Sequence, residues 1–416
     1  MRKAAIELVT ALAFAGCGAG AQTTPPGLAP AAALVADAAP TAPESSVGAR
    51  SPAAPPSSSS ASQGPLASGA PDAGAPDITA GAPLPPARPA TIPLSSGHGD
   101  PGDTELAAGD EAFERGDLVA AEKSYAAARA VGGQTTKSAA AVGTARVRIA
   151  REGAPLDYAS AKGNSSIAAA AKDLARIAKE NPEFGPAFVE LGRARLLLGD
   201  AAGSIESLKR GASLLPDEPE AHSQLGVAWL ATGHSEEAVR ELARATELDM
   251  GSGARHGNLG TALLMAGRTK EAIAEYELHV RIDDGDARAH SDLGTALLAT
   301  TDLERALSEL TRATALEPRR ASFHSNLGYA LQQAGQSDRA IAEYREALRL
   351  DAGLASAWIN LATILARNPK TRAEARAALA RAAAASPDDP RVKANLDELN
   401  ALEKGTSPVP GTGAGH

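Results

Sequence analysis

Residues 219–252 read PEAHSQLGVAWLATGHSEEAVRELARATELDMGS, and residues 253–286 repeat the pattern as GARHGNLGTALLMAGRTKEAIAEYELHVRIDDGD. Both segments carry Leu-Gly at the same place, at Leu225-Gly226 and Leu259-Gly260. The pair recurs every 34 residues from Leu191-Gly192 to Leu327-Gly328, and Leu361-Ala362 continues the series. Self-similarity at a fixed period of this length predicts a stack of similar units rather than one globular core.

Each unit also carries a large apolar residue between two small ones. In residues 219–252 these are Ala238, Leu242 and Ala245. The spacing predicts two helices of roughly 13 residues each, joined by a turn near Gly233, because glycine tolerates the left-handed backbone of a helix end. Small residues let the two helices approach closely. One pair cannot bury its apolar faces alone, so neighbouring pairs must stack.

This pattern resembles the tetratricopeptide repeat family, whose 34-residue unit also has Pro near its end, as at Pro216, Pro318 and Pro387. The resemblance implies an all-α fold, an α-solenoid wound as a right-handed superhelix of about eight helix pairs. It divides the chain into two degenerate repeats with an insertion at 102–184, six repeats at 185–389 and a capping helix at 390–404.

The composition of the 416 residues excludes several classes of protein. A net charge of −9 argues against binding nucleic acid by charge alone. The single cysteine allows no internal disulfide and no cysteine-rich metal site. The sequence has no apolar run of the roughly 18 residues that a membrane-spanning helix needs.

The N-terminus has the features of an export signal. Residues 1–21 begin with a basic Met1-Arg2-Lys3 and continue with a mostly apolar stretch, interrupted by Glu7. The run that ends at Cys17 resembles the lipobox of bacterial lipoproteins, which implies lipid attachment at Cys17. Gly18 then favours the outer membrane, facing the periplasm. Two alternatives remain: cleavage after Ala21, which would release a soluble periplasmic or secreted protein, and no export at all.

Residues 22–101 form a low-complexity segment. They hold 17 of the 28 prolines and no aromatic residue. A segment of this composition buries too little apolar surface to offset the entropy of ordering, so we predict a disordered Pro/Ala/Ser-rich tether. Residues 405–416 are predicted to be a disordered tail.

Four histidines share one position of consecutive repeats: His222, His256, His290 and His324. Phe188 and Trp358 occupy the same position in the flanking repeats, which favours packing of the rings within the stack. A pH sensor and a metal site are the alternatives. The metal is disfavoured because neighbouring helices lie about 8–10 Å apart and no further ligand recurs beside the histidines. His279 stands where the family keeps a small residue, so we expect it to bulge the packing or lean toward solvent.

No catalytic motif is found in the repeats. Gly251-Ser252-Gly253 lies in a turn between repeats and follows no strand, and the run 283–286 lacks the spaced ligands of a calcium loop. We therefore predict that the chain is not an enzyme and uses no cofactor.

The resemblance also implies a groove lined by the first helix of each repeat. Small residues at the fifth position of four repeats, such as Gly257 and Ser291, would leave room for an incoming chain. The basic clamp of chaperone-binding members is not seen, so we expect a neutral groove. Its predicted partner-binding residues are Asn258, Thr261, Leu264, Asp292, Thr295, Leu298, Asn326, Tyr329, Gln333, Asn360 and Thr363. The alternative is that these polar residues only solvate the surface or cap helices.

Together these features predict a non-catalytic scaffold for protein–protein interaction in the bacterial cell envelope. It would bind protein or peptide segments in the groove and would meet the membrane only through an N-terminal lipid anchor. The resemblance extends to outer-membrane tetratricopeptide lipoproteins. The alternatives are a soluble exported adaptor and a binder that responds to pH or metal through the histidine series.

Overall fold

The structure is a computed structural model that describes residues 85–88, 91–152, 162–300 and 302–405. This part of the chain holds seventeen α-helices, one short 3₁₀ helix and no strand. The predicted signal peptide with Cys17, most of the predicted tether and residues 406–416 lie outside it. The helices are α3 (Asp103–Glu114), α4 (Leu118–Val131), α5 (Gln134–Arg151), α6 (Ser165–Glu180), α7 (Gly185–Leu197), α8 (Ala201–Leu214), α9 (Pro219–Ala231), α10 (Ser235–Leu248), α11 (Gly253–Met265), α12 (Thr269–Ile282), α13 (Ala287–Leu298), α14 (Leu303–Leu316), α15 (Ala321–Gln333), α16 (Ser337–Leu350), α17 (Ala355–Ala366), η1 (Pro369–Thr371), α18 (Arg372–Ala385) and α19 (Pro390–Glu403).

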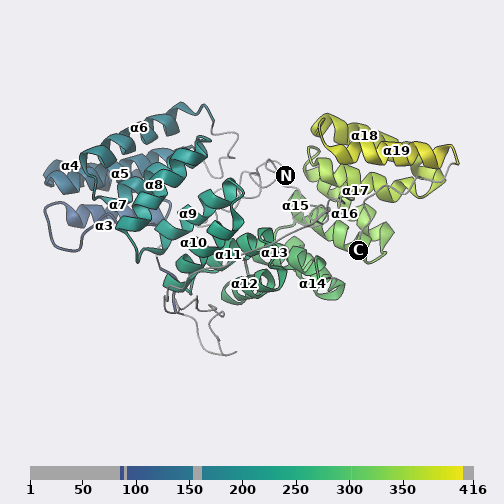
Figure 1. The fold of residues 1–416 in the computed structure, drawn as a ribbon, viewed down its shortest axis with the longest axis horizontal. Coiled ribbons are helices and arrows are strands. Elements are labelled where there is room, and N and C mark those ends of the chain that lie inside the picture. Colours follow the sequence, from purple (N-terminus) through teal and green to yellow (C-terminus); the bar gives the residue numbers. More distant parts are fainter. Residues whose placement is uncertain (1–84, 89–90, 153–161, 301, 406–416) are drawn as a thin grey trace, which may run out of the picture.

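The helices pack as consecutive pairs, from α3 with α4 to α17 with α18, and α19 closes the stack against α17 and α18. Each pair also contacts the next, so the apolar core runs along the array. Figure 1 shows the result as an arch, with α3 to α6 at one end and α17 to α19 at the other. The predicted all-α solenoid of about eight helix pairs is confirmed.

The turns within pairs follow from local sequence. Gly199 ends one helix with φ of 85°, in the left-handed region that glycine adopts at little cost. Asp200 then caps the next helix, because its side chain accepts a hydrogen bond from the backbone N–H of Gly203 at 2.9 Å. Asp117 and Asp302 cap α4 and α14 in the same way.

The Leu-Gly series brings the two helices of a pair into contact. A Cβ added to Gly226 would lie 2.5 Å from Cγ of Leu242, and one added to Gly294 would lie 2.7 Å from Cγ of Leu310. Both leucines are fully buried. The missing side chain of each glycine therefore makes the space that the large residue of the partner helix fills.

The first helix of each pair forms the inner face of the arch. Successive first helices contact one another along the described array, α5 against α7, α7 against α9 and so on, whereas successive second helices make weaker contact or none. In Figure 1, α11 and α13 accordingly lie nearer the hollow of the arch than α12 and α14. We call the surface of the odd-numbered helices from α3 to α17 the inner face.

The folded region begins earlier than the sequence predicted. Residues 91–101 belong to the predicted disordered tether, yet Ile92 and Leu94 are only 3% and 5% exposed. Ile92 joins the apolar cluster of Val189 and Leu225, and Leu94 joins that of Leu106. The tether boundary at residue 101 is therefore wrong, because two apolar side chains in a Pro-rich segment are enough to pack onto a preformed surface.

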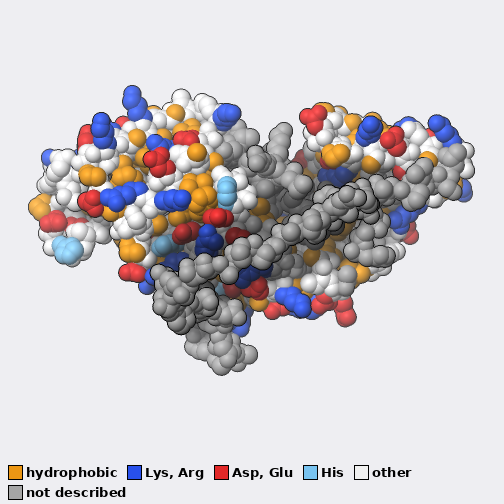
Figure 2. Space-filling model, in the orientation of Figure 1, with side chains coloured by type: hydrophobic (Ala, Val, Ile, Leu, Met, Phe, Trp, Pro, Cys, Tyr) orange, Lys and Arg blue, Asp and Glu red, His pale blue; other side chains and the backbone are white. Residues whose placement is uncertain are grey.

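On the side of the molecule seen in Figure 2, basic and acidic side chains are interspersed at both ends of the arch. Among the described helices, none is both long and apolar enough to cross a membrane.

Candidate functional site

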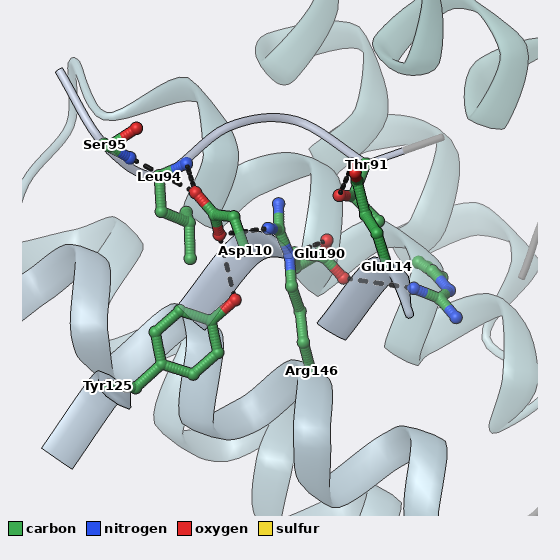
Figure 3. Close-up of polar contacts among 9 residues, drawn as sticks. Thr91, Leu94, Ser95, Asp110, Glu114, Tyr125, Arg146 and Glu190 are labelled. Carbon is green, nitrogen blue, oxygen red and sulfur yellow. Dashed lines mark hydrogen bonds and ion pairs between the residues drawn. The ribbon is translucent and has the colours of Figure 1, made fainter. Parts of the chain in front are cut away.

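A buried ion cluster lies on the inner face where α3, α5 and α7 meet (Figure 3). Arg146 of α5 is 1% exposed. Its Nε donates to Oε1 of Glu190 at 2.5 Å, and its Nη1 lies 3.6 Å from Oδ1 of Asp110. The O–H of Tyr125 also donates to Oδ1 of Asp110, at 2.9 Å. Two carboxylates and one guanidinium are thus held together beneath the surface.

Residues 91–97, which we call the strap, cross directly over this cluster (Figure 3). The backbone N–H of Leu94 donates to Oδ2 of Asp110 at 2.6 Å. Two helical turns earlier in α3, Asp103 accepts the backbone N–H groups of Ser96 and Gly97 at 2.6 and 2.8 Å. The strap is therefore held by main-chain hydrogen bonds to carboxylates, a kind of contact that does not depend on the sequence of the bound segment.

Burial sets the electrostatics of the cluster. It raises the pKa of Asp110, and the nearby charge of Arg146 and the hydrogen bond from Leu94 oppose that shift. Burial and the charge of Asp110 raise the pKa of Tyr125 well above its ordinary value. Tyr125 therefore remains a hydroxyl donor throughout the physiological pH range.

A second buried arginine repeats the arrangement further along the inner face. Arg255 of α11 is 5% exposed, and it donates to Asp249 at 3.0 Å and to Glu220 at 3.1 Å. Asp249 in turn accepts the backbone N–H of Arg88 at 3.1 Å. Here too a carboxylate held by a buried arginine binds the main chain of the N-terminal segment.

The contact at residues 85–88 is close. A Cβ on Gly251 would lie 2.0 Å from the carbonyl oxygen of Pro85, so only glycine allows this approach. In the sequence, Gly251 is only part of a weak Gly-x-Gly motif in a turn between repeats. The structure shows that its lack of a side chain admits the main chain of a distant segment.

Three of the predicted groove residues are buried and serve internal contacts: Thr261, Thr295 and Asn326 are 4%, 5% and 8% exposed. Thr261 shares a hydrogen bond with Tyr276 of its own helix pair at 3.0 Å. The amide of Asn326 donates to Ser291 of the preceding repeat at 3.1 Å. These groups hold the stack together and do not form an open surface.

The other predicted groove residues retain accessible surface. Thr363 and Asp292 also make internal contacts, to Asn395 of the end helix at 2.9 Å and to Arg288 at 3.4 Å. The half-buried or exposed residues that remain on the inner face are Asn258, Leu264, Leu298, Tyr329, Gln333 and Asn360.

His279 neither bulges nor turns to solvent, contrary to expectation, because two glycines make room for it. The ring is 6% exposed, and its Nε2 lies 3.1 Å from Oδ2 of Asp286. Added Cβ atoms at Gly253 and Gly257 would lie 2.5 and 2.8 Å from ring atoms of His279. The space that Gly257 was expected to leave for an incoming chain is therefore filled from within.

The four histidines at the shared position each bridge two parts of their repeat. Nδ1 faces a glutamate 19 residues later, at 2.6–2.8 Å. Nε2 faces a backbone carbonyl six residues earlier, at 2.9–3.1 Å. Both partners are acceptors, so only the doubly protonated ring satisfies both contacts. The pairs are His222–Glu241, His256–Glu275, His290–Glu309 and His324–Glu343.

These contacts raise the pKa of two of the histidines. The hydrogen bond that His222 donates to Glu241 raises the pKa of His222, against the opposing effect of burial. Burial lowers the pKa of His324, but the hydrogen bonds to Glu343 and to the carbonyl of Pro318 outweigh it, so that pKa is raised too.

Sequence analysis missed the partner glutamates, although a signal for them exists. They recur every 34 residues in the four repeats that carry histidine, whereas the repeats with Phe188 and Trp358 have Ser207 and Ala377 at that place. Trp358 keeps one of the two contacts, since its Nε1–H donates to the carbonyl of Ala352 at 2.9 Å. Within the described residues, no group of three or more His, Cys, Asp or Glu side chains could hold a metal ion.

The repeated helix pairs define an α-solenoid whose inner face is partly covered by residues 91–97. A family model for the tetratricopeptide repeat matches residues 224–287, 291–355 and 326–390, so the chain contains tetratricopeptide repeats over these residues. No curated protein matches the sequence.

Several solved structures share the fold. The APC/C hetero-tetramer Cut9–Hcn1 has a TM-score of 0.53 at 16% identity, over 71% of this chain and 55% of that one. MamA has a TM-score of 0.36 at 22% identity, over 38% of this chain and 94% of its own. For pilF of Pseudomonas aeruginosa the TM-score is 0.45 at 17% identity, over 52% of this chain and 98% of that one. At these identities the likeness concerns the fold alone.

Proposed function

We propose that this chain is a non-catalytic protein-binding scaffold whose inner face holds extended polypeptide segments. One observation carries the proposal: the inner face holds such a segment of its own chain. Asp103 and Asp110 on α3 accept backbone N–H groups from residues 94–97, and Asp249, in the turn after α10, accepts that of Arg88. Main-chain contacts of this kind suit an extended ligand of varied sequence.

The other half of the inner face has suitable chemistry as well. Leu264, Leu298 and Tyr329 offer partly exposed apolar surface, and Asn258 and Asn360 offer amides that donate and accept hydrogen bonds. Apolar side chains of a ligand would lie against the leucines and the tyrosine, and its main chain would form hydrogen bonds with the asparagine amides. This part of the face adds length to the proposed binding surface.

Selection of binders from a displayed library of random 12-residue peptides tests the proposal. The substitution Leu264→Glu, on the inner face, is expected to weaken the selected peptides at least tenfold. Val131→Glu is the matched control, since Val131 lies on the second helix α4 and is 58% exposed. Circular dichroism checks that both variants fold. Recovery of no peptide, or equal loss in both variants, would contradict the proposal.

We further propose that the scaffold works in the bacterial cell envelope, anchored through a lipid on Cys17. The support is the sequence pattern of residues 1–21. Membrane fractionation and mass spectrometry of the mature N-terminus test it, with Cys17→Ala as the control. A lipid-modified Cys17 at the mature N-terminus is expected. A mature chain that begins at Gln22 without acylation would refute the anchor.

A further inference from the structure

The guanidinium of Arg146 is only partly satisfied. Its Nε is paired with Glu190, but neither Nη1 nor Nη2 has a hydrogen-bond acceptor among the described residues, and Oε2 of Glu190 has no hydrogen-bond donor. Arg146 is 1% exposed and lies beneath the strap. Buried N–H groups without an acceptor are costly, so this cluster is a place where a bound chain would gain by supplying a carbonyl.

The strap supplies only half of what the cluster can bind. It gives the backbone N–H groups of Leu94 and Ser95 to Asp110, at 2.6 and 3.3 Å. None of the hydrogen bonds of Arg146 within the described structure goes to a strap carbonyl. Pro93 has no N–H, which limits the strap further. An extended chain in another register could place an N–H at Asp110 and a C=O at Arg146 together.

We propose that the strap is a displaceable intramolecular occupant of the inner face, and that the Asp110–Arg146 pair is the binding site for the main chain of an extended partner segment. This inference rests on the proposed function. It adds where the partner binds, which side chains recognise its main chain, and that the strap competes with it. The partner is an extended polypeptide with alternate apolar residues, the pattern that Ile92 and Leu94 show in the strap.

The charges favour a neutral main chain as the bound group. Arg146 faces Asp110 and Glu190, and Arg193 lies 3.6 Å from Glu190, so two positive and two negative groups balance. A further unpaired charge in this buried place would be costly, whereas an amide offers one donor and one acceptor.

A labelled peptide of residues 85–101, added in trans, tests the proposal by fluorescence anisotropy. Ile92→Asp with Leu94→Asp in the full chain should release the strap and tighten peptide binding at least tenfold relative to the unmodified chain. Val119→Asp with Val131→Asp, at exposed sites on α4, is the matched control and should leave the affinity unchanged. Equal affinities for all three chains would overturn the proposal.

Hydrogen exchange of the unmodified chain gives a second readout that needs no variant. Excess unlabelled peptide should accelerate exchange at the backbone amides of Leu94 and Ser96 at least tenfold, because both amides are hydrogen-bonded only while the strap is bound. Peptide binding that leaves this protection intact would overturn displacement. If library peptides bind the Leu264 region while the strap never moves, this inference fails and the proposed function stands.

Discussion

The pairs His222–Glu241 and His324–Glu343 make the stability of the solenoid depend on pH in a defined direction. We take His222 and Glu241, whose side chains are 13% and 29% exposed. The folded state raises the pKa of His222 above its ordinary 6.5. The protonated ring is therefore favoured by folding, so the added stability is complete below pH 6.5 and is lost as pH rises through the folded-state pKa.

The magnitude follows from the contacts that protonation allows. A hydrogen bond between charged groups contributes about 1.5–3 kcal/mol, and partial exposure of Glu241 places this pair near the lower end. A double-mutant cycle of His222→Gln and Glu241→Gln, by urea unfolding, should give a coupling of about 1.5 kcal/mol at pH 5.5. At high pH the ring loses one proton and its charge, so the Coulombic attraction to the ionised Glu241 is lost and the coupling should fall below its value at pH 5.5.

The exposed pair Arg176–Glu180 on α6 is the control, because arginine and glutamate side chains at a protein surface ordinarily keep their charges between pH 5.5 and 9. Its coupling should stay below about 0.5 kcal/mol at every pH. A coupling at His222–Glu241 that is absent at pH 5.5, or that grows with pH, would refute the reasoning.

Three further predictions concern packing and buried charge, all measured by urea unfolding. Gly226→Ala should destabilise by about 1–3 kcal/mol, because its Cβ would lie 2.5 Å from Leu242, and retention of full stability would count against the close helix contact. Gly257→Ala should destabilise the chain by about 1–2 kcal/mol, because the added Cβ would lie 2.8 Å from the ring of His279. In a chain that also carries His279→Ala, the same substitution should destabilise much less, and additive effects of the two substitutions would contradict this. Glu190→Gln should cost about 3–5 kcal/mol by leaving Arg146 buried beside Asp110 alone, and a loss under 1 kcal/mol would show that the cluster carries little energy.

The fold was predictable because it is encoded repeatedly. The interval of Leu-Gly set the repeat length, and the alternation of small and large residues set which faces meet. The repeat pattern did not predict how exceptions to it would pack. His279 departs from the family pattern, and its ring fits only because Gly253 and Gly257 have no side chains. A pattern that considers each position of the repeat separately does not connect these three residues.

The candidate site was less predictable, because its parts are distant in sequence and belong to the least regular repeats. Asp110, Arg146 and Glu190 come from three different helices and show no recurring spacing. The strap lies in a segment whose composition predicts disorder, and only the packing of Ile92 and Leu94 shows otherwise. The family pattern gives the position of each groove residue on its helix, but it does not indicate whether a side chain such as Thr261 is buried by its neighbours.

Site-specific photocrosslinking tests most directly whether the inner face binds polypeptide. A photoreactive phenylalanine analogue would replace Tyr329 on the inner face, or Arg339 at an exposed place on the second helix α16. Library-selected peptides are expected to crosslink from position 329 and not from position 339. Crosslinking from 339 alone, or equally from both positions, would contradict the account.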